Sequence, residues 1–319
     1  MSGAWPPLPA CADEGGVSFW LPGLFGSFAA APGNPGWSGT LISYHTSVSA
    51  GGGKVFQDGT NIVAGLSGQG DLALYGITYT FAQPVVGGQF AVSVFNVAGR
   101  NAADVSATLT GPLGNQISGT RGQSLTSFGD LIPQTTLKWN SGVNNFMIYG
   151  TGDIPVGDYD ANRLANLGIG HGAIDGGAGY TYLNPATGYE FSATGGLTYN
   201  FENMATQYQN GIDSHIDWGL SKFLTKQFDV GIVGYYFQQL TGDSGSGDRL
   251  GPFRSRVVGL GPQANLLFPV GDKVSGAASL KLYKEFDAQN RPEGWNAWLT
   301  ISLSEAPPHP AAAPVTVKY

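Results

Sequence analysis

The segment Gly188–Phe201, with the sequence GYEFSATGGLTYNF, alternates apolar and polar residues along most of its length. Successive side chains of a strand point to opposite faces, so this segment has one apolar face and one polar face. The apolar face carries Tyr189, Phe191, Ala193, Leu197, Tyr199 and Phe201, and the polar face carries Glu190, Ser192, Thr194, Thr198 and Asn200. In a soluble sandwich the apolar face would pack on a second sheet. In a transmembrane barrel it contacts hydrocarbon, and the polar face lines the lumen.

Similar segments recur along the chain, and their connections favour the barrel. We expect twelve strands, at residues 39–49, 71–82, 88–98, 127–140, 143–154, 173–183, 188–201, 213–223, 227–241, 254–268, 274–286 and 294–304. Short turns alternate with mostly long connections, as in outer-membrane barrels, where the turns face the periplasm. The longer connections are expected at 50–70, 99–126, 155–172, 202–212, 242–253 and 287–291. The sequence therefore predicts an all-β fold, a closed antiparallel transmembrane β-barrel of about 12 strands with an N-terminal plug segment.

The composition excludes several other classes of protein. Only 12% of the 319 residues are charged, against roughly 25% in soluble domains. The mean hydropathy is nevertheless −0.04, and no run of about 18 apolar residues indicates a transmembrane helix. A net charge of −7 without a basic patch argues against a nucleic-acid partner. The single cysteine, Cys11, excludes an internal disulfide and a cysteine-based metal site. We expect no metal and no cofactor.

The two ends of the chain differ from the predicted barrel at residues 39–304. Residues 1–12 end in a small-residue pattern, Ala10-x-Ala12, that fits the remnant of a signal peptide, although a disordered tail is an equal alternative. Residues 13–38 are rich in glycine, proline and aromatics, so we expect an irregular plug inside the barrel. Within it, Phe19, Trp20, Leu24 and Phe25 are expected to form an aromatic pocket on the substrate path. The Pro/Ala-rich residues 305–319 are expected to be a disordered periplasmic tail.

Alternation along the predicted strands also assigns side chains to the two faces of the wall. The expected lumen-lining residues are His45, Lys138, Asp175, Glu190, His215, Asp217, Asp229, Lys281 and Glu285. They would form a selectivity path beside the plug, or they would only satisfy the polar interior that any barrel has. Arg254 and Arg256 are in phase with the lipid face and are expected to meet lipopolysaccharide phosphates. Pro262 lies within a strand, and because it cannot donate to the ladder we expect a bulge there.

Motifs that resemble catalytic or metal sites are better explained in other ways. The turn Gly242–Ser246 has the residues of a serine-protease nucleophile loop but no histidine in a suitable context. Asp243 and Asp248 offer oxygen ligands for Ca²⁺, but their spacing fits no calcium loop. His45 and Ser47 share a strand face, as a serine and a histidine do in outer-membrane phospholipases. We nevertheless predict that the chain is not an enzyme and has no catalytic residue.

Several long blocks of the sequence resemble one family of outer-membrane proteins, which is involved in the meta-pathway of phenol degradation. The blocks are Glu14–Ala29, Tyr180–Pro185, Gly234–Asp243, Gly259–Gln263 and Glu285–Trp295. This family is similar to the outer-membrane transporters of long-chain fatty acids and aromatic hydrocarbons. The resemblance implies uptake of hydrophobic molecules and an N-terminal segment that acts as a plug.

Together these observations predict a barrel of the Gram-negative outer membrane that passively takes up small hydrophobic compounds, aromatic or lipid-like. Its expected partners are those compounds, outer-membrane lipid and lipopolysaccharide, and the outer-membrane assembly machinery. Two alternatives stay open. The barrel would be a structural or ligand-binding protein without transport, or, less favoured, a membrane-embedded hydrolase that uses Ser47.

Overall fold

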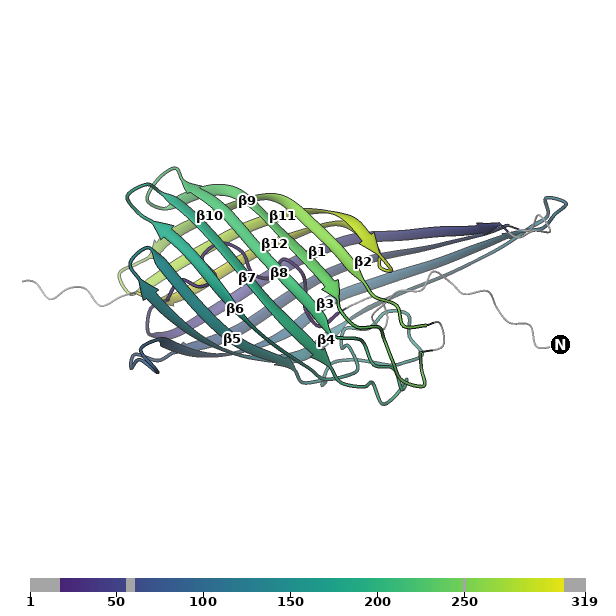
Figure 1. The fold of residues 1–319 in the computed structure, drawn as a ribbon, viewed down its shortest axis with the longest axis horizontal. Helices are drawn as coiled ribbons and strands as arrows, with labels where there is room; N and C mark the ends of the chain where they lie inside the picture. Colours follow the sequence, from purple (N-terminus) through teal and green to yellow (C-terminus); the bar gives the residue numbers. More distant parts are fainter. Residues whose placement is uncertain (1–17, 56–60, 249–250, 307–319) are drawn as a thin grey trace, which may run out of the picture.

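The computed structural model describes residues 18–55, 61–248 and 251–306 and forms a closed antiparallel barrel of twelve strands (Figure 1). The strands are β1 (Gly36–Val55), β2 (Asn61–Thr80), β3 (Gln89–Thr110), β4 (Gln116–Ser141), β5 (Asn144–Asp153), β6 (Ala173–Asn184), β7 (Tyr189–Asn200), β8 (Asp213–Phe223), β9 (Phe228–Gln239), β10 (Arg256–Val270), β11 (Val274–Gln289) and β12 (Glu293–Glu305). Each strand pairs with its neighbours in sequence, and β1 closes the barrel on β12. The predicted fold class and strand number are confirmed. The predicted signal-peptide remnant and nearly all of the predicted tail lie outside the described residues.

The two faces of the wall have opposite chemistry, as the alternation predicted. On β7 the polar residues from Glu190 to Asn200 are buried inside the barrel, while Tyr189, Leu197 and Tyr199 are exposed on the outside. The outer surface carries exposed leucine, isoleucine, valine and aromatic side chains on all twelve strands. Such an extensive apolar surface is unfavourable in water and matches the hydrocarbon band of a lipid bilayer. Among the described residues, no helix is long and apolar enough to span a membrane.

Aromatic side chains gather on the outer surface near the short turns. Trp37 contacts Tyr79, and Tyr79 contacts Phe81, with ring centroids 4.9 and 5.0 Å apart. Trp139 donates a hydrogen bond from Nε1 to the carbonyl of Val86 in the adjacent turn. Rings of this kind mark the level at which hydrocarbon gives way to headgroups.

The predicted loops at 50–70 and 99–126 are wrong, because most of these residues are strand. β1 and β2 stay in register from Gly36 opposite Thr80 to Val55 opposite Asn61. β3 and β4 stay paired as far as Thr110 opposite Gln116, so the four strands project beyond the barrel on the side of the long loops (Figure 1). These residues are rich in glycine, serine and alanine, so the ladder continues without the apolar alternation that identifies a strand from sequence.

The bulge predicted at Pro262 is also wrong. Pro262 lies opposite Ile232 of β9 in regular register, and the ladder to β11 only skips Gly261 and Pro262 without a shift. The missing N–H is therefore accommodated by one interrupted bridge instead of an extra residue. The register of β10 and β11 shifts between Arg256 and Val258, where Asp287 on the partner strand has a φ of 56°.

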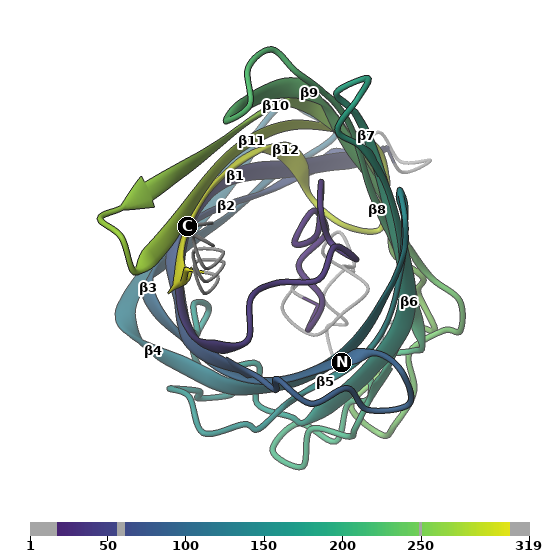
Figure 2. The ribbon, with the colours of Figure 1, turned by 90° about the vertical axis from the view of Figure 1, so that its left-hand side faces the viewer.

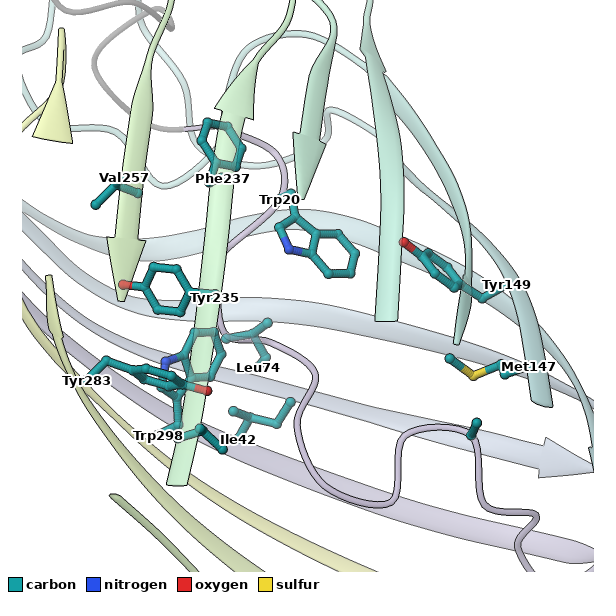
Figure 3. Close-up of a cluster of buried hydrophobic side chains, with 12 residues drawn as sticks. Trp20, Ile42, Leu74, Met147, Tyr149, Tyr235, Phe237, Val257, Tyr283 and Trp298 are labelled. Carbon is teal, nitrogen blue, oxygen red and sulfur yellow. The ribbon is translucent and has the colours of Figure 1, made fainter. Parts of the chain in front are cut away.

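An irregular segment, Ser18–Pro35, lies inside the ring of strands and is called the inner segment below (Figure 2). It covers most of the described part of the predicted plug, residues 13–38, but residues 36–38 belong to β1, which begins at Gly36. Apolar side chains of the inner segment pack with inward-facing residues of the wall, so the barrel contains a hydrophobic cluster in place of an empty channel (Figure 3).

Candidate functional site in the barrel lumen

A carboxylate and an ammonium group on the wall hold the same turn of the inner segment. The backbone N–H groups of Gly23 and Phe25 donate to the two carboxylate oxygens of Asp217 on β8, at 2.9 and 3.1 Å. Nζ of Lys281 on β11 donates to the carbonyls of Gly23, Leu24 and Phe25, at 2.5, 3.0 and 3.1 Å. Asp217 and Lys281 are both buried. The wall thus satisfies the donors and the acceptors of a turn that forms no regular secondary structure.

Glu190 on β7 makes a second attachment further along the inner segment. Its carboxylate accepts hydrogen bonds from the Ser27 hydroxyl at 2.6 Å and from the Phe28 N–H at 3.0 Å. The hydroxyls of Ser192 and Ser221 donate to the same carboxylate at 2.5 and 3.1 Å. Glu190 is completely buried, so these four donors replace the water that its charge would otherwise require.

Two further contacts fix the end of the inner segment near β1. The N–H of Ala30 donates to the Thr181 hydroxyl on β6 at 3.0 Å. Nζ of Lys138 on β4 donates to the carbonyl of Ala31 at 3.1 Å. Gln89 of β3, Gln263 of β10 and Glu305 of β12 also bond the inner segment, at Gly33, Ser27 and Asn34. The attachments therefore come from eight strands, β3, β4, β6, β7, β8, β10, β11 and β12, distributed around the wall.

Trp20 anchors the other end of the inner segment on a histidine. Its ring stacks on His215 with centroids 3.6 Å apart and planes 12° apart. Nε2 of His215 lies 2.9 Å from Asp175 and 3.3 Å from the hydroxyl of Tyr149. Phe25 packs on the same group, 5.5 Å from Trp20 and 5.3 Å from Tyr149. All of these groups except Phe25 are buried, so the stack seals this part of the lumen.

The lumen is more apolar than the sequence analysis predicted. Ile42 and Leu74, from β1 and β2, point inward together with Tyr235, Tyr283 and Trp298, as Figure 3 shows. Sequence reasoning assigned the apolar face of every strand to lipid and so missed this inner cluster. The apolar residues at alternate positions Ile42, Tyr44 and Val48 of β1 were the signal that could have identified it.

Eight of the nine predicted lumen residues point inward, and one does not. Asp175, Glu190, His215, Asp217, Asp229, Lys281 and Glu285 are all buried, and Lys138 reaches the inner segment. Asp229 accepts a hydrogen bond from Asn265 of the wall at 2.7 Å. Glu285 accepts from the Tyr235 hydroxyl and from the Gly294 N–H, each at 2.8 Å.

His45 lies on the outer face, so its assignment to the lumen is corrected. Its Nδ1 is 2.6 Å from Asp71 on β2, both side chains are exposed, and its ring contacts Trp295, 4.8 Å away. The inward positions of β1 are the even-numbered ones, and from Ile42 to Val48 these carry the larger apolar residues. Ser47 shares the outer face with His45, but among the described residues no hydrogen bond joins the two.

A cavity of about 320 Å³ opens between the inner segment and the wall at the long-loop end of the barrel. Its walls come from the inner segment, from the inner faces of β1 and β2, from the β5–β6 loop and from the β11–β12 turn. Apolar side chains contribute most of the lining, and they include Leu21, Pro22, Val48, Leu72, Leu164, Leu167 and Ile169. Phe19, Trp20, Leu24 and Phe25 were predicted to form the pocket, yet they do not line this cavity; Leu21 and Pro22 between them do.

The outward loops give no support for a metal site. Asp243 accepts hydrogen bonds from Tyr208, Gln239 and the N–H of Gly211, at 2.5, 2.6 and 3.1 Å, and burial raises its pKa. It therefore orders the loop. Within the described part of the chain, no group of three or more histidine, cysteine or acidic side chains could hold a metal ion. Arg256 pairs with Asp287 at 3.0 Å on the outer side, while Arg254 is exposed.

Solved structures with related folds include outer-membrane channels. The COG4313 outer membrane channel from Pseudomonas putida F1 aligns with a TM-score of 0.66 at 14% identity, over 86% of this chain and 97% of that one. A Pseudomonas aeruginosa FadL homologue has a TM-score of 0.37 at 10% identity, over 84% and 89%. The CymD monoaromatic hydrocarbon channel has a TM-score of 0.36 at 9% identity, over 86% and 90%.

No curated protein matches this chain in sequence. The COG4313 channel, with its TM-score of 0.66, shows that the two chains share a barrel fold. One family model does match, over residues 52–301, and its description is "Putative MetA-pathway of phenol degradation". Because this match covers well over half of the 319 residues, the chain belongs to that family.

Proposed function

We propose that this protein is an outer-membrane channel through which small hydrophobic compounds enter passively, with the inner segment as its plug. The observation that carries the proposal is the apolar cavity between Leu21 and Pro22 of the inner segment and the inner faces of β1 and β2. A concave, mostly apolar site with a few polar groups is the usual form of a small-molecule site.

The apolar cluster beyond the cavity supports the same function. A water-filled pore would have a polar bore, whereas this lumen carries Ile42, Leu74 and Trp298. An apolar solute that leaves the cavity therefore meets other apolar side chains when the inner segment shifts. The tight contacts of the inner segment predict slow, gated passage, and no step in it requires an energy source.

The orientation of the barrel follows from its connections. The β4–β5, β6–β7, β8–β9 and β10–β11 connections are short turns, and the β5–β6, β7–β8 and β9–β10 loops are longer. Short turns face the periplasm in outer-membrane barrels, so the cavity opens toward the cell exterior. The family to which the chain belongs, with its link to phenol degradation, supports an aromatic compound as the cargo.

The test is deletion of residues 18–35 from the full-length protein, followed by reconstitution into liposomes. The flux of a small apolar dye should rise over that of the intact barrel, because the deletion removes the contacts that fill the lumen. The heat-dependent mobility shift of folded barrels on gels would show that the shortened protein still folds. An unchanged flux through a folded barrel would refute the channel and favour a structural or ligand-binding barrel.

A further inference from the structure

The cavity contains an arginine that forms no ion pair with another described residue. Arg291, in the β11–β12 turn, lines the cavity, and its Nε and Nη1 atoms are buried without a hydrogen-bond partner. Its guanidinium lies over the ring of Phe237, 5.1 Å from the centroid. A cation–π contact compensates only part of the cost of taking an arginine out of water. Arg291 therefore lacks an ion-pair partner among the described residues, in a cavity whose lining is mostly apolar.

The other charged groups of the cavity lining already have an ion-pair or hydrogen-bond partner. Arg163 lines the cavity as well, but it forms an ion pair with Asp158. Glu285 is the one carboxylate of the lining, and both of its oxygens accept hydrogen bonds, from Tyr235 and Gly294. Among the described residues, no ion pair joins Glu285 to Arg291. These neutral donors satisfy the oxygens of Glu285 without removing its negative charge. The cation that a ligand could pair with is therefore Arg291, whose Nε and Nη1 atoms have no partner among the described residues.

We propose that the cavity selects amphipathic monoanions, in which a carboxylate pairs with Arg291 and a ring or short chain lies against Leu21, Leu72 and Leu164. This inference rests on the proposed function and deepens it, because it names the substrate class of the same site. Arginine binds carboxylates through paired N–H donors, and such charged hydrogen bonds are strong where water is excluded. The nearby Glu285 disfavours a dianion such as a phosphate monoester.

The size of the cavity limits the ligand to a small one. A volume of about 320 Å³ is near the lower end of the range for ligand sites, roughly 300–1,000 Å³. A benzoate-sized acid or a medium-chain fatty acid fits this limit. Arg291 also lets the site discriminate against neutral ligands, which apolar contacts alone would not do. A ligand without a carboxylate would leave the buried guanidinium without a partner, which is costly.

Binding of matched ligands to the full-length protein in detergent tests the inference. Benzoate and octanoate are compared by equilibrium dialysis with their neutral amides, benzamide and octanamide, and with phenyl phosphate. We expect both carboxylates to bind at least tenfold more tightly than their amides and than phenyl phosphate. In Arg291→Gln this preference should fall to less than threefold, and Arg291→Lys should retain part of it. Arg254→Gln, which removes an exposed arginine outside the cavity, is the matched control and should bind as the wild type does.

Two outcomes would overturn the inference. One is equal binding of acid and amide by the wild type. The other is a carboxylate preference that survives in folded Arg291→Gln, as judged by its gel mobility shift, or that disappears in Arg254→Gln. The liposome flux of a neutral dye separates this inference from the proposed function. Carboxylate preference without flux would leave a binding site and refute the channel, and flux without carboxylate preference would refute only the role of Arg291.

Discussion

Replacing Asp217 by asparagine should release the middle of the inner segment. The carboxylate accepts two backbone N–H groups, from Gly23 and Phe25. A hydrogen bond to a charged group contributes about 1.5–3 kcal/mol, and a neutral amide oxygen can keep one weaker bond. The expected loss is therefore about 2–4 kcal/mol, because two charged bonds are replaced by one neutral bond. Because about 1.4 kcal/mol changes an equilibrium constant tenfold, the population in which the inner segment is detached should rise roughly 30- to 1,000-fold.

Hydrogen–deuterium exchange of Asp217→Asn measures this release directly, because the amides of Gly23 and Phe25 are protected by the bonds in question. Their exchange should accelerate by the same factor, and the conductance of the barrel in planar bilayers should become larger or more variable. Asp229→Asn is the matched control, since Asp229 is an equally buried carboxylate that contacts Asn265 instead of the inner segment. Equal exchange in wild type and Asp217→Asn, or an equal effect of Asp229→Asn, would refute the reasoning.

Three further substitutions probe the stack, the lipid face and the hydrolase alternative. Trp20→Ala leaves a void beside His215 and should lower the free energy of unfolding by about 3–5 kcal/mol, as measured by urea titration in vesicles. Leu299→Arg on the outer face should cost about 2–4 kcal/mol in the same assay, whereas Leu113→Arg, at an exposed hairpin tip, should cost nothing measurable. Ser47→Ala should leave dye flux unchanged and produce no loss of ester hydrolysis; a hydrolytic activity abolished by this change would revive the enzyme hypothesis.

The strand positions could be predicted because successive residues of a membrane barrel face different environments, which selects apolar and polar residues in alternation. Lipid outside and polar neighbours inside impose the period of two seen at Gly188–Phe201, and eight of the predicted lumen residues, among them Asp217 and Lys281, follow from it. The prediction of an irregular plug rested on composition; the described residues 18–35 form no regular secondary structure and lie inside the ring of strands (Figure 2).

The remaining features depend on contacts that no local pattern encodes. The outer halves of β1 to β4 leave the bilayer, so glycine and serine occupy both faces and the period disappears. His45 was misplaced because the adjacent lumen is filled by protein, which reverses the expected polarity of β1 from Ile42 to Val48. The cavity arises where the β5–β6 loop and the β11–β12 turn meet the inner segment. No pattern in the sequence indicated that Arg291 would line it.

The strands that hold the inner segment lie on opposite sides of the barrel, and this has a mechanical consequence. An empty cylinder of hydrogen-bonded strands can flatten into an ellipse at little cost, because the strands tilt without losing their ladder. The inner segment is hydrogen-bonded to β3, β4, β6, β7, β8, β10, β11 and β12 and opposes that flattening. The inner segment then resists part of the lateral pressure from the bilayer. A change that releases the inner segment should therefore also make the barrel wall easier to deform.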